Sequence, residues 1–326
     1  MLVRDHTWNG LLPAAMRAGI RDVVDMTQGS EELRDAVERA IVWASNLRSM
    51  TNAATGPDGL TTSRGRVISV FSSKGGTGKT FLAANLATSL ADLTGQDTAV
   101  VDLDIDMGDV FTYFGREPSA TIQDLMELGE GADHEAIRRV GVQLGDHLWA
   151  FGAPPDPAAE APAGEAVGKF LRAIRSEFQY IVVDASVDYS DSALVCFDLS
   201  DTICLVTGLD VVGVKHLSKA LDTLLTIGLP RERFRVVLNR ADSKVGLDAG
   251  DVERVMKIQV DAMIPSSRLV PTSLNKGRPV VLDEPTSDVA ASVRSLASKF
   301  TGTLEFAEPQ VIPTEKRKRF RLFSRS

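Results

Sequence analysis

The residues best suited to chemistry stand at 73–80, where the chain reads Ser-Lys-Gly-Gly-Thr-Gly-Lys-Thr. Glycines allow the backbone to form a nest of N–H groups around phosphate oxygens. Lys79 could neutralise the β- and γ-phosphates of a nucleotide, and the Thr80 hydroxyl could bind Mg²⁺. A Gly-rich turn that binds nothing is the alternative. The sequence predicts a nucleotide cradle made by Lys74, Gly75, Gly76, Thr77, Gly78, Lys79, Thr80 and Phe81.

Two further strand ends carry carboxylates. The apolar run 98–103 includes Asp102 and leads into Asp104, and the run 180–183 ends at Asp184. Ligands of open α/β sheets bind at the carboxyl ends of the strands. Because side chains alternate along a strand, Asp102 and Asp104 should point to the same side. The later acids Asp106 and Asp109 are interpreted as loop solvation and capping.

The elements that must position these groups follow an α/β pattern. The loop 73–80 follows an expected strand at Val67–Phe71 and precedes an expected helix at Phe81–Ala91. This order of strand, loop and helix is typical of a phosphate-binding P-loop. Nearly continuous apolar runs separated by helical stretches indicate a parallel sheet buried on both faces. We therefore expect a doubly wound, mostly parallel domain over 66–306, with strands at 67–71, 98–103, 180–183, 202–206 and 234–238.

The chain ends differ from this domain. Residues 1–49 have a helical pattern around a short strand at 20–24, which is too little chain for an independent core. Residues 50–65 are small, polar and rich in breakers, so we expect a flexible linker. Residues 307–326 end in a basic tail in which Phe320, Leu322 and Phe323 stand among Lys and Arg. Lys316 to Arg325 could make a peripheral membrane contact or form a solvated, disordered tail.

Composition narrows the class of partner and the compartment. Acidic residues outnumber basic ones by 44 to 36, and the net charge of -8 makes specific nucleic-acid binding unlikely. Cys196 and Cys204 have neither metal-type nor disulfide-framework spacing, which favours buried thiols in a reducing compartment. The start lacks a secretory pattern, and no run approaches the ~18 apolar residues of a membrane span. We expect a cytoplasmic protein.

The lysine that precedes the paired glycines, Lys74, resembles the deviant Walker A motif of the ParA/MinD family of ATPases. The resemblance implies that Lys74 reaches the partner's nucleotide, so that ATP is the condition for a homodimer; a solvated surface lysine is the alternative. It also implies that Asp104 orients the attacking water and that Asp102 supports the metal shell. The segment ending at Asp184 resembles Walker B and would hold Mg²⁺ through water.

The same resemblance indicates a base site and two departures. The Asn that matches Asn239 contacts adenine in MinD-like proteins, and Arg240 stands beside it. The loop that matches Ile264-Pro265-Ser266-Ser267 covers the base in those proteins. A strand-end cap or turn residue is the alternative for Asn239. Many relatives continue after Walker B with a Pro- or Gly-containing switch, which is missing from 185–191. Phe81 replaces a hydroxyl residue that often meets the α-phosphate, although its backbone N–H could still serve.

Longer segments look like the CpaE/TadZ proteins of Flp-type (Tad) pilus assembly, namely 102–110, 153–157, 239–247 and 264–282. Those proteins carry a degenerate receiver domain ahead of the ATPase, and 14–48 resembles only its closing helix, strand and helix. We expect either a reduced receiver or a recorded start downstream of the true one, and we favour the second. The resemblance implies pilus or secretion assembly partners at the cytoplasmic face of the membrane.

Three functions of the dimerising kind remain open from the sequence, and a small-molecule kinase or transferase with a related P-loop is a further alternative against which Lys74 argues. The first is a slow Mg²⁺-dependent ATPase whose ATP-bound dimer recruits a pilus-assembly or secretion machine. The second is a division-site or partitioning ATPase of the MinD or ParA kind. The third is a scaffold that binds ATP only to dimerise, which the altered segment 185–191 motivates.

Overall fold

The computed structural model describes residues 2–4, 23–25, 64–104, 108–118, 120–128, 132–152, 162–242 and 246–301. The predicted tail, the linker up to residue 63 and most of the segment 1–49 lie outside them. Within that segment, β1 (Leu2–Arg4) and β2 (Val23–Asp25) pair in parallel. The strand expected at 20–24 therefore lies partly in β2, and β1 was not expected. The receiver-like interpretation stays a prediction.

The main sheet has eight strands in the order β10-β9-β8-β3-β7-β4-β6-β5, and every pairing is parallel except that of β5 with β6. The expected doubly wound, mostly parallel α/β fold is confirmed. All five expected strands are present: β3 (Arg66–Phe71), β4 (Thr98–Asp102), β7 (Tyr180–Asp184), β8 (Thr202–Thr207) and β9 (Phe234–Asn239). The sequence did not predict β5 (Val142–Gly145), β6 (Leu148–Phe151) and β10 (Val260–Ile264).

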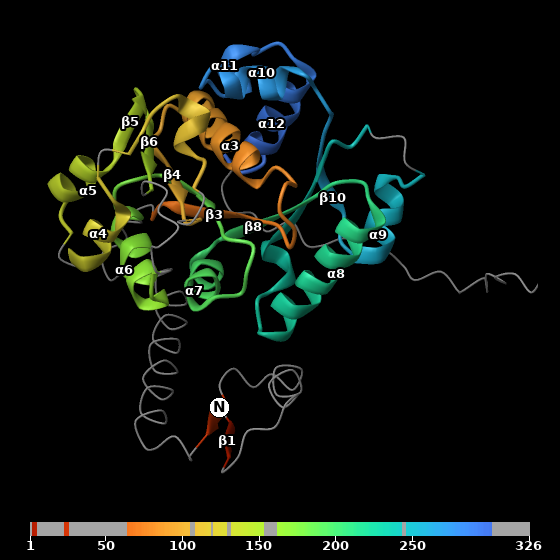
Figure 1. The fold of residues 1–326 in the computed structure, drawn as a ribbon, viewed down its shortest axis with the longest axis horizontal. Helices are drawn as coiled ribbons and strands as arrows, with labels where there is room; N and C mark the ends of the chain where they lie inside the picture. The colour runs from red at the N-terminus through yellow and green to blue at the C-terminus, as the bar shows by residue number, and fades with distance from the viewer. Residues whose placement is uncertain are drawn as a thin grey trace, which may run out of the picture.

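Helices cover both faces of this sheet (Figure 1). One face carries α3 (Lys79–Thr94) and α12 (Asp288–Ser298), together with the short α10 (Leu269–Asn275) and α11 (Val280–Asp283). The other face carries α6 (Gly164–Ile174), α7 (Asp191–Leu199) and α8 (Val211–Thr226), with α4 (Ile122–Leu128), α5 (His134–Val140) and α9 (Ala249–Met256) at the flanks. The described part of the domain also contains the 3₁₀ turns η2 (Phe111–Phe114) and η4 (Arg231–Arg233).

Strand alternation divides the core between the two faces. Ile68 and Val70 of β3 pack with α3 and α12, whereas Val67 and Phe71 face the opposite helices. All four side chains are fully buried. Because β3 is covered on both sides, it holds the loop that follows it on a rigid support.

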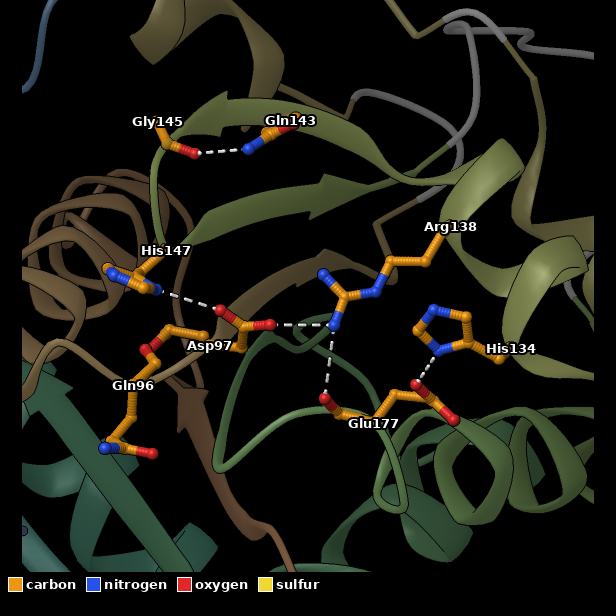
Figure 2. Close-up of polar contacts among 9 residues, drawn as sticks. Gln96, Asp97, His134, Arg138, Gln143, Gly145, His147 and Glu177 are labelled. Carbon is orange, nitrogen blue, oxygen red and sulfur yellow. Dashed lines mark hydrogen bonds and ion pairs between the residues drawn. The ribbon is translucent and has the colours of Figure 1, made fainter.

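The amino-terminal edge of the sheet is tied by a polar network (Figure 2). The Asp97 carboxylate accepts hydrogen bonds from Arg138 at 2.8 Å and from His147 at 3.0 Å. Arg138 lies over the Trp149 ring, 4.3 Å from its centroid. Although burial alone would raise it, these hydrogen bonds hold the pKa of Asp97 below its ordinary value. The network joins α5, the start of β4 and the β5–β6 turn, far from the phosphate-binding edge.

Within the described residues, no helix is long and apolar enough to cross a membrane.

Candidate functional site

The predicted phosphate loop lies between β3 and α3, at the carboxyl edge of the sheet. Gly76 and Gly78 have φ values of 73° and 95°, which L side chains rarely adopt. A Cβ added at Gly78 would lie 2.2 Å from Nδ2 of Asn239, whereas one added at Gly75 would meet nothing within 4 Å. The helix α3 begins directly after this turn at Lys79. Its first N–H groups therefore point toward the loop, as anion binding at a helix N-terminus requires.

The Asn239 side chain braces this loop. Its Nδ2 donates to the Thr77 carbonyl oxygen at 2.7 Å, and its Oδ1 accepts from the Arg240 N–H at 3.0 Å. Asn239 is 8% exposed, so these hydrogen bonds are shielded from water. The sequence offered an adenine contact or a strand-end cap for Asn239 and did not indicate this brace, because 162 residues separate Asn239 from the loop. The adenine contact stays a prediction.

Three polar side chains of the predicted site meet beneath the loop. Lys79 Nζ lies 4.0 Å from Oδ1 of Asp184, and the Thr80 side chain hydrogen-bonds to the same carboxylate. Asp184 is 1% exposed, and its Oδ1 has no hydrogen-bond partner among the described residues. An orphaned carboxylate oxygen beside a hydroxyl is a donor set that Mg²⁺ prefers. Thr80 and Asp184 therefore fit the predicted metal.

Asp102 lies opposite Asp184 on the neighbouring strand. It is 4% exposed, and its oxygens accept from the Asp104 N–H at 3.1 Å and the Val110 N–H at 3.0 Å. Burial and the charge of Asp184 raise the pKa of Asp102 to about 8. Burial likewise raises the pKa of Asp184 to about 6, although Lys79 opposes the shift. Asp102 thus organises the backbone after β4, a role that the sequence did not predict.

Asp104 is half-buried, and its charge raises the pKa values of both Asp102 and Asp184. Asp104 therefore lies close to Asp184. Because β4 ends at Asp102, Asp104 lies beyond the strand, and the expected alternation of the two side chains stays a prediction. Asp109 is exposed, and Asp106 lies outside the described residues. The water-orienting role of Asp104 and the metal-shell role of Asp102 stay predictions.

A pocket of about 450 Å³ opens beside the loop. Three predicted base-site residues line it, namely Asn239, Arg240 and Pro265, and Phe81 forms part of the wall. Arg240 has φ 54°, a left-handed conformation that is uncommon outside glycine. The structure thus brings the predicted base site against Gly78 of the phosphate loop.

The same pocket contains Ser266 and Ser267, which belong to the loop expected to cover the base. It also contains residues that the sequence did not indicate, namely Tyr113, Arg268, Val270 and Pro271. Tyr113 comes from η2, which contacts α10. Burial, with the charges of Asp109 and Asp184, raises the pKa of Tyr113 to about 12. For Tyr113 the sequence offered only its position shortly after Asp102. The packing of η2 against α10, which brings Tyr113 to the pocket, is a tertiary contact.

Lys74 lies on the solvent side of the loop, with its side chain 47% exposed. Its Nζ is 3.8 Å from Oδ1 of Asp210, the N-cap residue of α8. Such a half-exposed pair contributes little to stability, so Lys74 can leave Asp210 at low cost. The position suits both the proposed trans contact and a solvated lysine.

The segment after Asp184 has its own hydrogen bonds. Asp188 accepts from the Ser186 hydroxyl at 2.7 Å and from the Ser190 hydroxyl and N–H at 2.8 and 3.2 Å. Tyr189 packs near Phe71, with ring centroids 5.9 Å apart. An Asp–Ser turn therefore shapes the segment where the sequence lacks Pro and Gly.

Comparison with known proteins agrees with this geometry. The family model described as the CobQ/CobB/MinD/ParA nucleotide binding domain matches residues 68–280. The septum site-determining protein MinD of Bacillus subtilis is 25% identical over 245 residues, which cover 73% of this chain and 90% of that protein. A ParA family ATPase from Chlorobium tepidum has a similar fold, with a TM-score of 0.68 and 22% identity over 73% of this chain and 99% of that one.

A third similar structure is MinD from Pyrococcus horikoshii, described as complexed with Mg-ADP. It has a TM-score of 0.63 and 22% identity, and covers 72% of this chain and 96% of that one. These structural likenesses show the fold.

Proposed function

This chain belongs to the CobQ/CobB/MinD/ParA nucleotide-binding domain family, and from that premise we propose that it is a Mg²⁺-dependent ATPase that dimerises when it binds ATP. One observation carries the proposal: Lys79, Thr80 and the orphaned carboxylate oxygen of Asp184 meet beneath a glycine loop at a helix N-terminus. This arrangement matches what a bound triphosphate and its metal require.

Each residue of the loop has a defined task in this proposal. Backbone N–H groups of 75–81 hold the phosphates, and Lys79 neutralises their charge. Thr80 and Asp184 hold Mg²⁺, which when bound would draw charge from the phosphate oxygens. Asp104 positions the attacking water, and Asp102 fixes the backbone of Asp104 through its N–H. Because the Asp188 turn replaces the Pro- or Gly-containing switch, we expect slow turnover.

The surroundings of Lys74 support the dimer. In the sheet order, the loops after β7 and β8 flank the loop after β3. The first exposes Val187 and Tyr189, and the second leads to Val211 and Val212, which are 68% and 53% exposed. Exposed apolar side chains around a half-exposed lysine favour an interface that forms when the nucleotide is bound.

The cellular task is proposed from motif similarity. The segments 102–110, 239–247 and 264–282 favour recruitment of a Flp/Tad pilus-assembly or secretion machine. The likeness to MinD and ParA proteins supports the alternative of a division-site or partitioning ATPase. In both cases we place the protein in the cytoplasm, with Lys316 to Arg325 as a candidate contact to the membrane surface.

The test is light scattering after size exclusion, with ADP or ATP and Mg²⁺, alongside phosphate release. We expect an ATP-dependent dimer in the wild type, its loss in Lys74→Ala and its retention in Lys169→Ala, a surface-lysine control in α6. ATP-bound monomers in all three proteins would refute the switch. A dimer without phosphate release would leave the scaffold, and a salt-sensitive shift of non-specific DNA would favour a ParA-like role.

A further inference from the structure

One wall of the pocket is an aromatic side chain that no motif marks. Tyr113 lines the pocket with Asn239, Arg240 and Pro265, although it comes from η2 rather than from the loops expected to meet a base. The ring is partly buried against the hydrophobic core under α3. Such packing limits its motion, so Tyr113 offers a preformed apolar wall.

A backbone contact fixes η2 in this position. Gly115, which ends η2, has φ 59° and lies against Gly277, which has φ 62°. A Cβ added at Gly277 would lie 2.5 Å from the Gly115 Cα, so the two loops touch through their backbones. The Tyr113 and α10 sides of the pocket are therefore joined into one wall.

The chemistry of this wall suits the base of a nucleotide. Phe81, Tyr113, Pro265, Val270 and Pro271 give apolar surface, while Asn239, Arg240 and Arg268 add polar groups. Flat heterocycles bind in such mixed pockets by stacking on rings and by hydrogen bonds at their edges. The phosphate loop lies at the same pocket through Gly78. A nucleotide with its phosphates in the loop can place its base here.

We propose that Tyr113 contacts the base of the bound purine nucleoside triphosphate and sets the preference of this site for a complete nucleotide over a triphosphate without a base. The inference rests on the proposed function, because it needs ATP at this loop. It adds a recognition residue outside the phosphate loop and outside the segments at Asn239 and Pro265.

The same contact links base binding to the predicted catalytic segment. Val110, which directly precedes η2, donates its N–H to Asp102, and Asp102 also holds the N–H of Asp104. One carboxylate therefore connects the Tyr113 turn to the residue that we propose positions water. Loss of the base contact should lower kcat as well as raise KM.

The experiment is a cycle that removes the tyrosine and the base separately. Binding of ATP and of ribose 5-triphosphate is measured for the wild type, Tyr113→Leu and Tyr113→Phe, with thermal unfolding as a check on folding. Tyr113→Leu should weaken ATP binding about 10-fold and leave the binding of ribose 5-triphosphate unchanged, because the variant lacks the aromatic ring on which the base stacks. Tyr113→Phe keeps the ring and should stay within about twofold of the wild type.

The outcomes separate this inference from the function on which it rests. A wild type that binds neither ligand overturns the ATPase proposal. If the wild type binds ATP and Tyr113→Leu binds it equally well, the base contact is refuted. The base contact is also refuted if the variant binds ATP and ribose 5-triphosphate more weakly by the same factor. If Tyr113→Leu does not fold, Tyr113→Phe decides. A Tyr113→Phe protein that binds ATP no more tightly than it binds ribose 5-triphosphate would keep the ring but lose the preference, and would also refute stacking.

Discussion

Replacing Asn239 with alanine tests how the phosphate loop is held. The change removes the donor to the Thr77 carbonyl oxygen at 2.7 Å and the acceptor of the Arg240 N–H at 3.0 Å. Each broken hydrogen bond at a shielded site costs about 1 kcal/mol. We therefore expect the free energy of unfolding of the nucleotide-free protein to fall by about 2 kcal/mol.

The effect on ligand binding separates two roles of Asn239. If its brace holds the loop in the phosphate-binding shape, Asn239→Ala should weaken the binding of ATP and of ribose 5-triphosphate by the same factor. That factor is roughly 10-fold for each 1.4 kcal/mol of binding free energy that is lost. If Asn239 only contacts adenine, ATP alone should weaken. Asn275→Ala, at an exposed position in α10, is the matched control.

Urea unfolding and isothermal titration calorimetry measure both quantities. An Asn239→Ala protein that unfolds like the wild type, and binds base-free triphosphate as tightly, would show that the hydrogen bond to Thr77 does not support the loop.

Three further changes have expected outcomes. Gly78→Ala should abolish nucleotide binding and lower the free energy of unfolding by about 2 kcal/mol, because Gly78 has a positive φ and an added Cβ would collide with the Asn239 side chain. The control Gly75→Ala should fold normally, because a Cβ there meets nothing. Equal stability of the two variants would contradict the geometry. In the folded protein the pKa of Asp102 is raised to about 8. Between about pH 4 and 8 the folded protein therefore keeps this proton, whereas the unfolded chain loses it. The free energy of unfolding of the nucleotide-free protein should then fall by up to about 1.4 kcal/mol per pH unit as the pH rises through that window. Thermal unfolding at pH 6 and 8 should show this trend, and Asp102→Asn should flatten it; an unchanged slope in the variant would assign the trend to another group. Asp97→Ala should lower the melting temperature and leave ATP turnover unchanged, since its hydrogen bonds to Arg138 and His147 lie at the opposite edge of the sheet; a loss of turnover at unchanged stability would argue against that separation.

The strands of the central sheet were readable from the sequence because they are buried on both faces. Continuous apolar runs such as 67–71 and 202–206 need no partner to be recognised. Two of the missed strands, β10 and β5, lie at the sheet edges and are less uniformly apolar, whereas the third, β6, is buried and apolar but only four residues long. β10 carries Asp261, whose carboxylate accepts from the Val236 N–H, and β5 alternates half-buried and exposed residues.

The chemistry of the phosphate loop was likewise fixed by local sequence. Its glycines, Lys79 and Thr80 are contiguous, and one strand and one helix position all of them. The brace from Asn239, the two N–H groups held by Asp102 and the Tyr113 wall were decided only in the folded chain. The Asp102 contacts are local in sequence, but they depend on how the chain turns after β4. The Asn239 brace and the Tyr113 wall join segments that are separated in sequence, by 162 residues for Asn239 and Thr77, and only the packing of strands and helices around the loop brings such segments together.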